Sequence, residues 1–516
     1  MSKPNIIFFM VDQLSTKWLE AASNGIIPTP NLDRLRSRGV TFTNCITSNP
    51  VCCPARATLA TGLTTRGHGL LQNGYELGTA IPTFMRALQQ NGWRTGALGK
   101  VHYLPHYRGL HPDYRPYGFD VVHNTEDARG GEWLEWVEEQ HPEHYECVLA
   151  TIWASAIPEY AAYGRNKVNL RDRIREIRDN FTWPTEKFPD NDQWTYALPF
   201  PEEVSQTAWI TQHALNFIRQ SESEQPIYAH ISYVQPHSPF APPGEYYQHV
   251  NEEAIPDPAP AEWFENPDTP GYFAGLQPES PWSWKKRRRN YFADIVHLDS
   301  KLGLVMDALE ETGRMENTFL IFLSDHGELL GDHGFYSKGE RHYDACIRVP
   351  LVIAGPGLKQ GVASDYFVQL EDLCPTVLET AGLPHPRFRV MGQAIKEEPK
   401  DIPTLPGRSL LPICRGERPD DWRTAAYCES YNGGRSIKPI DWARTIRTHE
   451  WRYTFYPTGG GEQLFNLQYD PDEQNNLVSD PSCEDIRHSL RDQLLEMIVL
   501  QDFPHTPRDL YAQGVH

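Results

Sequence analysis

The sequence predicts an α/β protein built around a large, mostly parallel central sheet flanked by helices, and three observations favour this class. Short runs of apolar, β-branched and aromatic residues recur along the chain, as at 5–11 and 227–234. Helical patterns such as 206–219 separate these runs. Polar residues follow directly where several of the runs end. Strands that alternate with helices are typical of a parallel sheet, which binds ligands beyond the carboxyl ends of its strands.

The same patterns predict the individual elements. Strands are expected at 5–11, 95–98, 227–234, 318–323 and 349–354, and helices at 29–35, 59–62, 83–91, 206–219 and 289–312. Four of the strand ends are followed by polar side chains, which are Asp12, Lys100, His237 and Asp325. Because the carboxyl ends of parallel strands share one edge of a sheet, we expect these four side chains to lie close together.

Two long segments interrupt the alternation of strands and helices. Residues 126–201 are rich in Trp and charge without clear periodicity, and residues 251–284 are rich in Pro. Both are interpreted as long insertions between elements of the sheet, and long loops of this kind often contain functional residues. Their Trp residues stack on sugar rings in one interpretation and pack in the core in the other.

The C-terminal part of the chain predicts a second, smaller unit. Residues 384–406 are Pro-rich and are interpreted as a linker. Beyond them, strand character and a helical pattern predict an α+β unit, with strands at 424–430 and 444–456 and a helix at 481–498. We therefore expect a catalytic domain at 1–395 and a C-terminal α+β subdomain at 396–516, in keeping with a length of 516 residues.

Composition and charge narrow the classes of partner. The net charge is -20, which argues against a nucleic-acid partner but is compatible with a small anionic substrate at a local basic site. A membrane span and a signal peptide are not expected, so a cytoplasmic location is predicted. The nine Cys residues are odd in number and form no CxxC pair, which favours reduced thiols. A homo-oligomer is compatible with the sequence.

One cysteine segment carries chemistry. It reads Val51-Cys52-Cys53-Pro54-Ala55-Arg56 and is followed by Thr61-Gly62. A Cys beside Pro and Arg at the start of a helix is either a thiolate of low pKa or a small core residue in a turn. The pattern Cys-x-Pro-x-Arg followed by Thr-Gly resembles the signature of the type I sulfatases of the alkaline-phosphatase superfamily. Only Cys52 has Pro two residues on and Arg four residues on.

The resemblance continues along most of the chain. Five further stretches resemble elements of that family, at 5–13, 99–102, 235–239, 324–339 and 464–477. It implies an alkaline-phosphatase-like fold and a sulfate ester as substrate. It also implies that a formylglycine-generating enzyme oxidises Cys52 to formylglycine. The hydrated aldehyde offers two hydroxyls on one carbon, one to attack sulfur and one to expel sulfate afterwards.

The resemblance also implies roles for single residues. The expected metal ligands are Asp12, Gln13, Cys52, Asp325 and His326; this oxygen-rich set suits Ca²⁺, with Mg²⁺ or Mn²⁺ as alternatives. Among the expected catalytic residues, Cys52 provides the nucleophile, Arg56 orients the formylglycine hydrate and Lys100 binds a sulfate oxygen. His102 acts as the base, His237 acts as the acid, and Lys338 stabilises the leaving oxygen. Asn73, Arg341 and His342 are expected to contact substrate. For a lone His, Lys or Asn, a structural role is the competing interpretation.

One residue leaves the subgroup open. Many members of the family carry Asp where this chain has Gln13, whereas choline sulfatases and phosphonate monoester hydrolases resemble the Asp12-Gln13 pair. The phosphonate hydrolases have hydroxyl-bearing residues in place of Lys100 and His102, so these two residues favour sulfate. The hypotheses are therefore a sulfatase for a sulfated sugar or small organic sulfate, a phosphonate or phosphodiester hydrolase, and a catalytically silent binding protein.

Overall fold

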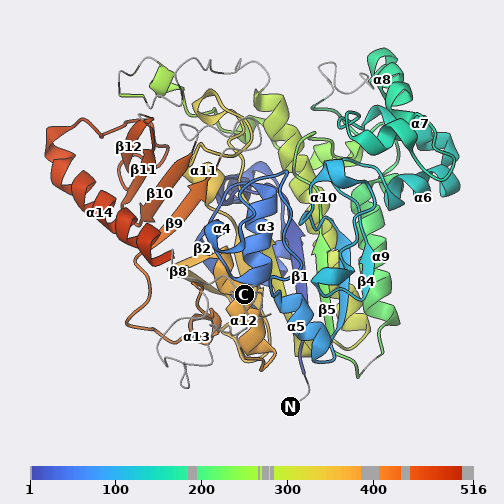
Figure 1. Cartoon of the computed structure of the whole chain (residues 1–516), viewed down its shortest axis with the longest axis horizontal. Helices are drawn as coiled ribbons and strands as arrows, with labels where there is room; N and C mark the ends of the chain where they lie inside the picture. Colours follow the sequence, from blue (N-terminus) through green and yellow to red (C-terminus); the bar gives the residue numbers. More distant parts are fainter. Residues whose placement is uncertain are drawn as a thin grey trace, which may run out of the picture.

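The computed structural model describes most of the chain (Figure 1). The described residues are 3–183, 194–222, 224–264, 284–384, 406–431, 442–458 and 460–501, with single positions at 266, 268, 269, 273 and 278. Among them, no helix is long and apolar enough to cross a membrane.

An eight-stranded sheet forms the centre of the molecule, in the order β4-β3-β5-β1-β6-β7-β2-β8. Its strands are β1 (Asn5–Val11), β2 (Gly39–Ile46), β3 (Arg94–Gly99), β4 (Val121–His123), β5 (Ile227–Ser232), β6 (Thr318–Ser324), β7 (Leu351–Ala354) and β8 (Val362–Gln369). β1 lies in the middle and pairs in parallel with both β5 and β6. The predicted α/β class with a large, mostly parallel sheet is thereby confirmed.

The alternation of side chains along β1 explains why both faces of this sheet are covered. Ile7, Phe9 and Val11 belong to one buried core, which α9 (Gln206–Gln220) and α10 (Trp284–Glu311) help to form. Ile6, Phe8 and Met10 belong to a second core on the other face, with α5 (Phe84–Gln90) and α12 (Leu373–Thr380). Successive residues of a strand point to opposite faces, so a strand apolar at every position is buried between two layers of helices.

Three details of the sheet differ from the prediction. The predicted strand at 349–354 is β7, and it alone among the described strands of this sheet runs antiparallel to its neighbours β6 and β2. Strands β2, β4 and β8 were not predicted, because polar residues interrupt β2 and β8 and β4 has only three residues. The helix expected at 59–62 is longer and begins at Cys52, as α3 (Cys52–Thr61).

A second, four-stranded antiparallel sheet follows in the C-terminal part, in the order β12-β11-β10-β9 (Figure 1). Its strands are β9 (Ala425–Ser430), β10 (Ala443–Thr448), β11 (Trp451–Tyr456) and β12 (Gly461–Asn466), and α14 (Glu484–Gln501) packs on it. The single strand expected at 444–456 is therefore a hairpin of β10 and β11. The predicted linker at 384–406 lies almost entirely outside the described residues.

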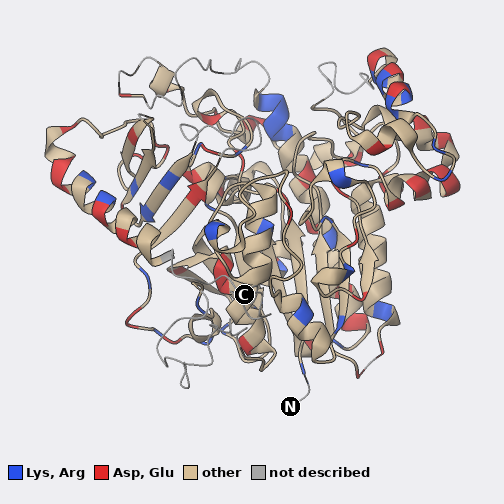
Figure 2. Cartoon of the chain, in the orientation of Figure 1, with Lys and Arg blue, Asp and Glu red and all other residues tan. Residues whose placement is uncertain are grey.

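The described part of the first insertion contains the α-helices α6 (Glu132–Gln140), α7 (Tyr145–Ala150) and α8 (Leu170–Asn180). Its Trp133 is buried and donates from Nε1 to the Val204 carbonyl at 3.0 Å, so this ring packs in the core. The basic run 285–289 opens α10, where Figure 2 shows a blue stretch of ribbon at one end of the helix. Arg288 in that run is fully buried and pairs with Asp332 at 2.7 Å, which gives it a structural role.

Candidate active site

The polar residues that follow the central strands converge at one edge of the sheet. β3, β5, β1 and β6 are neighbours that all run parallel, and the register pairs Val11 with Ser324 and Gly99 with Ser232. Asp12 and Asp325 therefore begin their loops side by side, and Lys100 begins its loop two strands away. The expected clustering of Asp12, Lys100 and Asp325 at this edge is what the structure contains.

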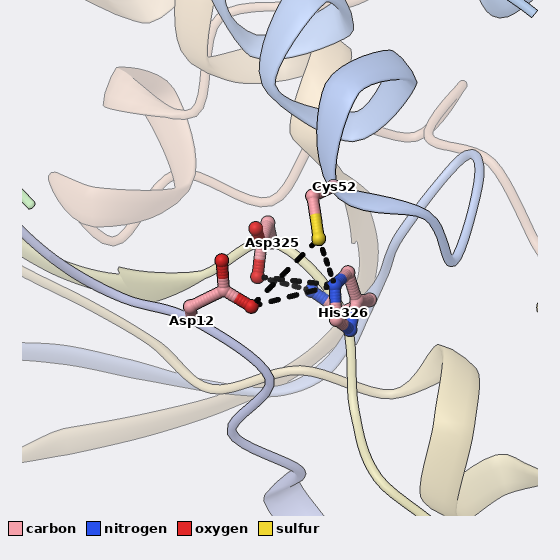
Figure 3. A group of neighbouring side chains, drawn as sticks. All are labelled: Asp12, Cys52, Asp325 and His326. Carbon is pink, nitrogen blue, oxygen red and sulfur yellow. Dashed lines mark hydrogen bonds and ion pairs between the residues drawn. The ribbon is translucent and has the colours of Figure 1, made fainter. Parts of the chain in front are cut away.

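Four buried side chains form a compact cluster here, Asp12, Cys52, Asp325 and His326 (Figure 3). Their ligand atoms all lie within 4.8 Å of one another. Nε2 of His326 lies 3.2 Å from Sγ of Cys52, 3.6 Å from Oδ1 of Asp12 and 3.7 Å from Oδ1 of Asp325. Two carboxylates and an imidazole that converge away from solvent are a typical setting for a divalent cation.

Gln13 contributes to the fit of a cation to this cluster. Its backbone lies in the left-handed region at φ 67°, a conformation rare for this residue type, and its N–H donates to Oδ1 of Asp325 at 3.1 Å. The side-chain Nε2 donates to Glu328, whereas Oε1 is buried without a hydrogen-bond partner. A buried amide oxygen without a partner is costly, and a hard cation would satisfy it.

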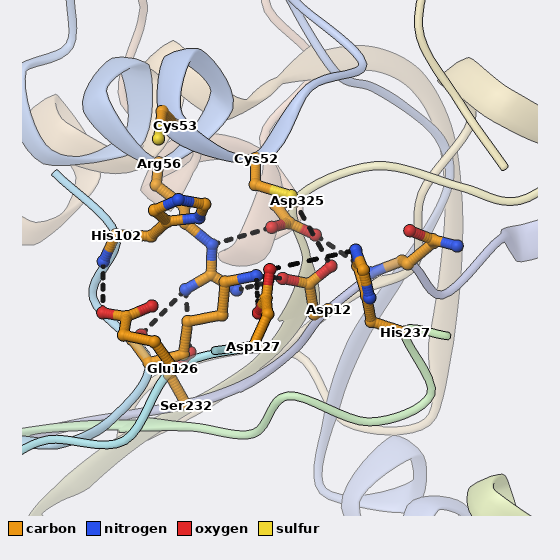
Figure 4. A network of polar contacts seen from close by, with 12 residues as sticks. Asp12, Cys52, Cys53, Arg56, His102, Glu126, Asp127, Ser232, His237 and Asp325 are labelled. Atoms are coloured by element: carbon orange, nitrogen blue, oxygen red, sulfur yellow. Dashed lines mark hydrogen bonds and ion pairs between the residues drawn. The ribbon is translucent and has the colours of Figure 1, made fainter. Parts of the chain in front are cut away.

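Helix α3 places the signature residues. Cys52 is its first residue, and the 3.6-residue period puts Arg56 on the same face one turn later. The Arg56 guanidinium is buried and donates from Nε to Asp325 at 2.8 Å and from Nη2 to Asp12 at 3.1 Å (Figure 4). It also donates from Nη1 to Ser232 Oγ at 3.0 Å. Arg56 therefore orients the two carboxylates of the cluster.

Positive charge surrounds the Cys52 sulfur. Lys338 Nζ donates to Sγ at 2.8 Å. Burial alone would raise the pKa of the Cys52 thiol, but the positive charges of Lys100, Lys338 and His326 outweigh burial and hold this pKa well below its usual value. The neighbouring Cys53 is equally buried, and burial raises the pKa of its thiol well above the usual value.

Lys100 and His237 meet at an acidic residue that sequence reasoning missed. Lys100 Nζ lies 2.5 Å from Oδ2 of Asp12 and 2.5 Å from Oδ1 of Asp127, and Nε2 of His237 lies 4.0 Å from Oδ2 of Asp127. Burial opposes ionisation of Asp127, but Lys100 and His237 hold the pKa of its carboxyl well below the usual value. Asp127 therefore lies between Lys100 and His237 at the edge of the cluster, and Figure 4 shows its carboxylate and the His237 ring side by side.

Glu126, also missed, holds the segment that carries His102. Its Oε1 accepts hydrogen bonds from the His102 backbone N–H at 3.0 Å, from Tyr114 Oη at 2.9 Å and from Asn124 Nδ2 at 3.0 Å. The His102 ring is buried and stacks on His106 with 4.2 Å between ring centroids. The signal that could have found Glu126 is strand β4, after which it follows at the same edge of the sheet.

The three expected substrate contacts lie outside this cluster of charges. Asn73 Oδ1 accepts from the Cys53 backbone N–H at 3.0 Å, so it caps the start of α3. His342 is fully buried, and its ring nitrogens lie 2.8 Å from Thr445 Oγ1 and 3.0 Å from Ser430 Oγ. In this arrangement neither ring nitrogen of His342 is free for a substrate. The Arg341 guanidinium lies over the Phe335 ring at 4.8 Å.

The fold and the residues at this edge of the sheet define a hydrolase with an alkaline-phosphatase-like fold. Residues 4–383 match the family model described as Sulfatase, and residues 331–499 match the one described as N-sulphoglucosamine sulphohydrolase, C-terminal. The chain belongs to the sulfatase family, whose members hydrolyse sulfate esters.

Relatives and solved structures agree with this membership. An arylsulfatase of Clostridium perfringens (strain 13 / Type A) is 26% identical over 535 residues, which cover 99% of this chain and 98% of the relative. The N-acetylglucosamine-6-O-sulfatase of Bacteroides thetaiotaomicron is 26% identical, with 92% and 82% covered. The crystal structure of the phosphonate monoester hydrolase of Agrobacterium radiobacter has a TM-score of 0.74 at 23% identity, covers 97% of this chain and 96% of that one, and shows the shared fold.

Proposed function

We propose that this sulfatase cleaves the sulfate monoester of a sulfated sugar or another small organic sulfate, with an aldehyde hydrate at position 52 as nucleophile and one divalent metal. The observation that carries the proposal is the burial of Cys52 at the start of α3, among Lys338, His326 and the carboxylates of Asp12 and Asp325. A thiol nucleophile does not require this set, whereas an oxygen nucleophile beside a hard cation does.

The nucleophile is made after translation. Conversion of the Cys52 side chain to an aldehyde is a two-electron oxidation of Cβ with loss of sulfur and gain of one oxygen from water. The sulfur leaves as sulfide, and two electrons and two protons pass to an external oxidant such as molecular oxygen in a reaction that a formylglycine-generating enzyme catalyses. That enzyme is therefore a partner during maturation. Cys53 is not the target, because it is not followed by Pro two residues later and Arg four residues later.

The metal would be held by Asp12, Gln13, Asp325, His326 and an oxygen on residue 52, where Sγ of Cys52 now stands in for that oxygen. Ca²⁺ suits this oxygen-rich set best, with Mg²⁺ or Mn²⁺ as alternatives. When bound, the cation polarises the sulfate oxygens and holds the nucleophile.

The cationic side chains bind the anion. Lys100 contacts a sulfate oxygen from its position beside Asp12, and Lys338 stabilises the leaving oxygen from its position beside Cys52. Arg56 orients the hydrate and keeps the two ligand carboxylates in place. Both lysines lie beside carboxylates or the thiol, so their ammonium groups stay charged when sulfate enters.

Two histidines move protons. His102, whose ring is buried in the loop that also carries Lys100, accepts the proton of the second hydroxyl as sulfate leaves. Nε2 of His237 gives a proton to the departing alcohol, while Nδ1 is held by the Ser238 carbonyl at 2.6 Å. Asp127 beside Nε2 of His237 stabilises the protonated ring before that transfer.

The substrate class rests on the relatives. A match to a glucosamine sulfohydrolase C-terminal model and a relative named for N-acetylglucosamine-6-O-sulfate favour a sulfated sugar. Arg341 and Asn73 remain proposed substrate contacts. A cytoplasmic location, a homo-oligomer and the boundary between 1–395 and 396–516 also remain proposals.

A substrate panel tests the proposal. Protein that is co-expressed with a formylglycine-generating enzyme and loaded with Ca²⁺ should hydrolyse aryl sulfate and at least one sulfated mono- or disaccharide. It should lose this turnover when a chelator removes the metal and regain it on addition of Ca²⁺. The second candidate, favoured by Gln13 beside Asp12, is a phosphonate hydrolase. A higher kcat/KM for phenyl phosphonate than for every sulfate in the panel, choline sulfate included, would replace the proposal with that candidate.

A further inference from the structure

A second group of metal-ligating side chains lies outside the catalytic cluster, where the outer strand of the large sheet meets the first insertion. His123 is the last residue of β4, Glu132 is the first residue of α6, and His213 lies within α9. One ligand atom from each of the three lies within 4.8 Å of the other two. Three elements from separate parts of the chain thus direct two imidazoles and one carboxylate to one point.

The contacts in this group are close and only partly shielded from water. His123 Nδ1 lies 2.6 Å from Oε1 of Glu132, and the rings of His123 and His213 stack with 3.8 Å between their centroids. The other carboxylate oxygen of Glu132 accepts from the Asn124 backbone N–H at 3.3 Å, which fixes the carboxylate. The side chains of His123 and Glu132 are 33% and 42% exposed, so an ion can reach them from solvent.

Neighbouring rings limit the orientations of the His213 side chain. Its ring lies against Trp209 with 4.3 Å between ring centroids, as well as against His123. Two stacked imidazoles with one carboxylate have no function in the proposed sulfatase chemistry.

We propose that His123, Glu132 and His213 bind a divalent late transition metal, with Zn²⁺ as the best match. Two imidazole nitrogens and one carboxylate oxygen are typical of zinc, whereas the oxygen-rich set at Asp12 and Asp325 suits Ca²⁺. Ligands around tetrahedral zinc lie about 3.4 Å apart, given bonds of about 2.1 Å. The three ligand atoms lie within 4.8 Å of one another and would draw together to that separation when the ion binds.

A metal at this position would tie the first helix of the insertion to the large sheet. β4 belongs to the sheet, α9 covers one of its faces, and α6 opens the insertion; Figure 1 shows the three elements at the same side of the molecule. Binding to the folded state alone raises stability in proportion to the logarithm of free metal over its Kd. Zn²⁺ should therefore raise the Tm of the protein.

Metal binding by the full-length, Ca²⁺-loaded protein tests the proposal. In excess Ca²⁺, which keeps the catalytic cluster filled, the wild type should retain one more equivalent of Zn²⁺ on equilibrium dialysis than the His213→Asn variant. Co²⁺ should give visible absorption bands of a protein-bound ion with the wild type, and these should be absent from His213→Asn. The matched control is His488→Asn, which removes an exposed histidine of α14 and should behave as the wild type.

Two further comparisons make the outcome decisive. Glu132→Gln keeps both histidines and should also lose the Zn²⁺-dependent rise in Tm, so the test stands even if His213→Asn does not fold. Turnover of aryl sulfate without added Zn²⁺ should be the same in wild type and both variants. Equal Zn²⁺ retention and equal Co²⁺ spectra for the wild type and a folded His213→Asn or Glu132→Gln protein would overturn the proposal.

Discussion

Cys52 and Cys53 are adjacent and equally buried, yet their surroundings differ in charge. Lys338 and His326 lie 2.8 Å and 3.2 Å from the Cys52 sulfur, whereas the backbone N–H of Cys53 is capped by Asn73. The helix period separates the two side chains by about 100° around α3. One thus faces the charged edge of the sheet and the other the apolar core, where it packs with aliphatic residues.

At the residue scale, we predict that Glu126→Gln lowers kcat for aryl sulfate by about 10- to 100-fold with a smaller effect on KM. Oε1 of Glu126 accepts several hydrogen bonds, among them one from the His102 backbone, and a neutral amide cannot accept all of them with equal strength. Steady-state kinetics measure the effect, with the exposed Glu139→Gln on α6 as matched control. Equal kcat values for the two variants would show that Glu126 does not position His102.

Asp127 allows a second prediction at this scale. Asp127→Asn should weaken the alignment of Lys100 and His237, because it removes the negative charge that both side chains face. We expect a loss in kcat/KM of about 10-fold or more, larger for substrates with a poor leaving group, because those need the proton from His237 most. The measurement is kcat/KM for a series of aryl sulfates that differ in the pKa of the phenol. A uniform loss across the series would separate Asp127 from proton donation by His237.

At the element scale, the site depends on close contact between β3 and β5. Gly99 ends β3 with φ 100°, and a Cβ at this position would lie 2.1 Å from the Ser232 carbonyl oxygen. That carbonyl accepts from the Lys100 N–H at 2.9 Å. The glycine therefore permits both the turn and the hydrogen bond that direct Lys100 toward Asp12.

We predict that Gly99→Ala lowers the free energy of unfolding by at least about 2 kcal/mol and reduces sulfatase activity, because β3 and β5 must separate. Gly92→Ala is the matched control. Gly92 also has a positive φ, 90°, but the nearest atom to its added Cβ is Lys3 Nζ at 3.8 Å. The control should cost only about 1 kcal/mol and leave activity intact. Urea unfolding and kcat/KM measure both; equal effects of the two substitutions would contradict the close-contact argument.

The elements that the sequence predicted best are the long, buried ones. β1 has the predicted bounds, because the short apolar run from Ile6 to Val11 is rich in β-branched and aromatic residues and ends at Asp12, which favours a buried strand. β4 was missed because three residues show no periodicity. Without this strand, nothing in the sequence indicated that Glu126 and Asp127 follow a strand end at the edge where the site lies. The direction of β7 was not predictable either, since local pattern does not encode which way a neighbouring strand runs.

At the scale of the whole molecule, the C-terminal sheet supports the loop before α3. The Glu429 N–H of β9 donates to the Ser48 carbonyl at 2.9 Å, and Ser48 Oγ donates to Glu371. Arg423 pairs with Asp372, the neighbour of Glu371. Segments more than 300 residues apart thereby hold the loop that leads to Cys52, and only the folded chain brings them together. Sequence patterns predicted the strand-end residues of the site but none of these supports.

Glu371 should make stability depend on pH. Burial, together with Asp372, raises the pKa of the Glu371 carboxyl to about 7. The folded protein therefore keeps a proton that the unfolded chain releases near pH 4.5, so this contribution to stability is complete below pH 4.5 and is lost as pH rises toward 7. The loss should be on the order of 3 kcal/mol.

Glu371→Gln, which stays uncharged, should remove that loss. Its Tm relative to the wild type should rise between pH 5 and pH 8, whereas the exposed Glu417→Gln should follow the wild type at every pH. Thermal unfolding across this range measures the difference. Parallel curves for Glu371→Gln and the wild type would mean that the Glu371 carboxyl loses its proton in both states at the same pH.

The central claim is that residue 52 acts as an aldehyde, and tandem mass spectrometry of the peptide that contains both Cys52 and Cys53 tests it most directly. After co-expression with a formylglycine-generating enzyme, we expect the aldehyde at position 52, an unmodified thiol at position 53, and aryl sulfatase activity that scales with the converted fraction. Cys53→Ala should convert normally, and Cys52→Ala should be inactive. Full sulfatase activity from protein that carries thiols at both positions would contradict the account.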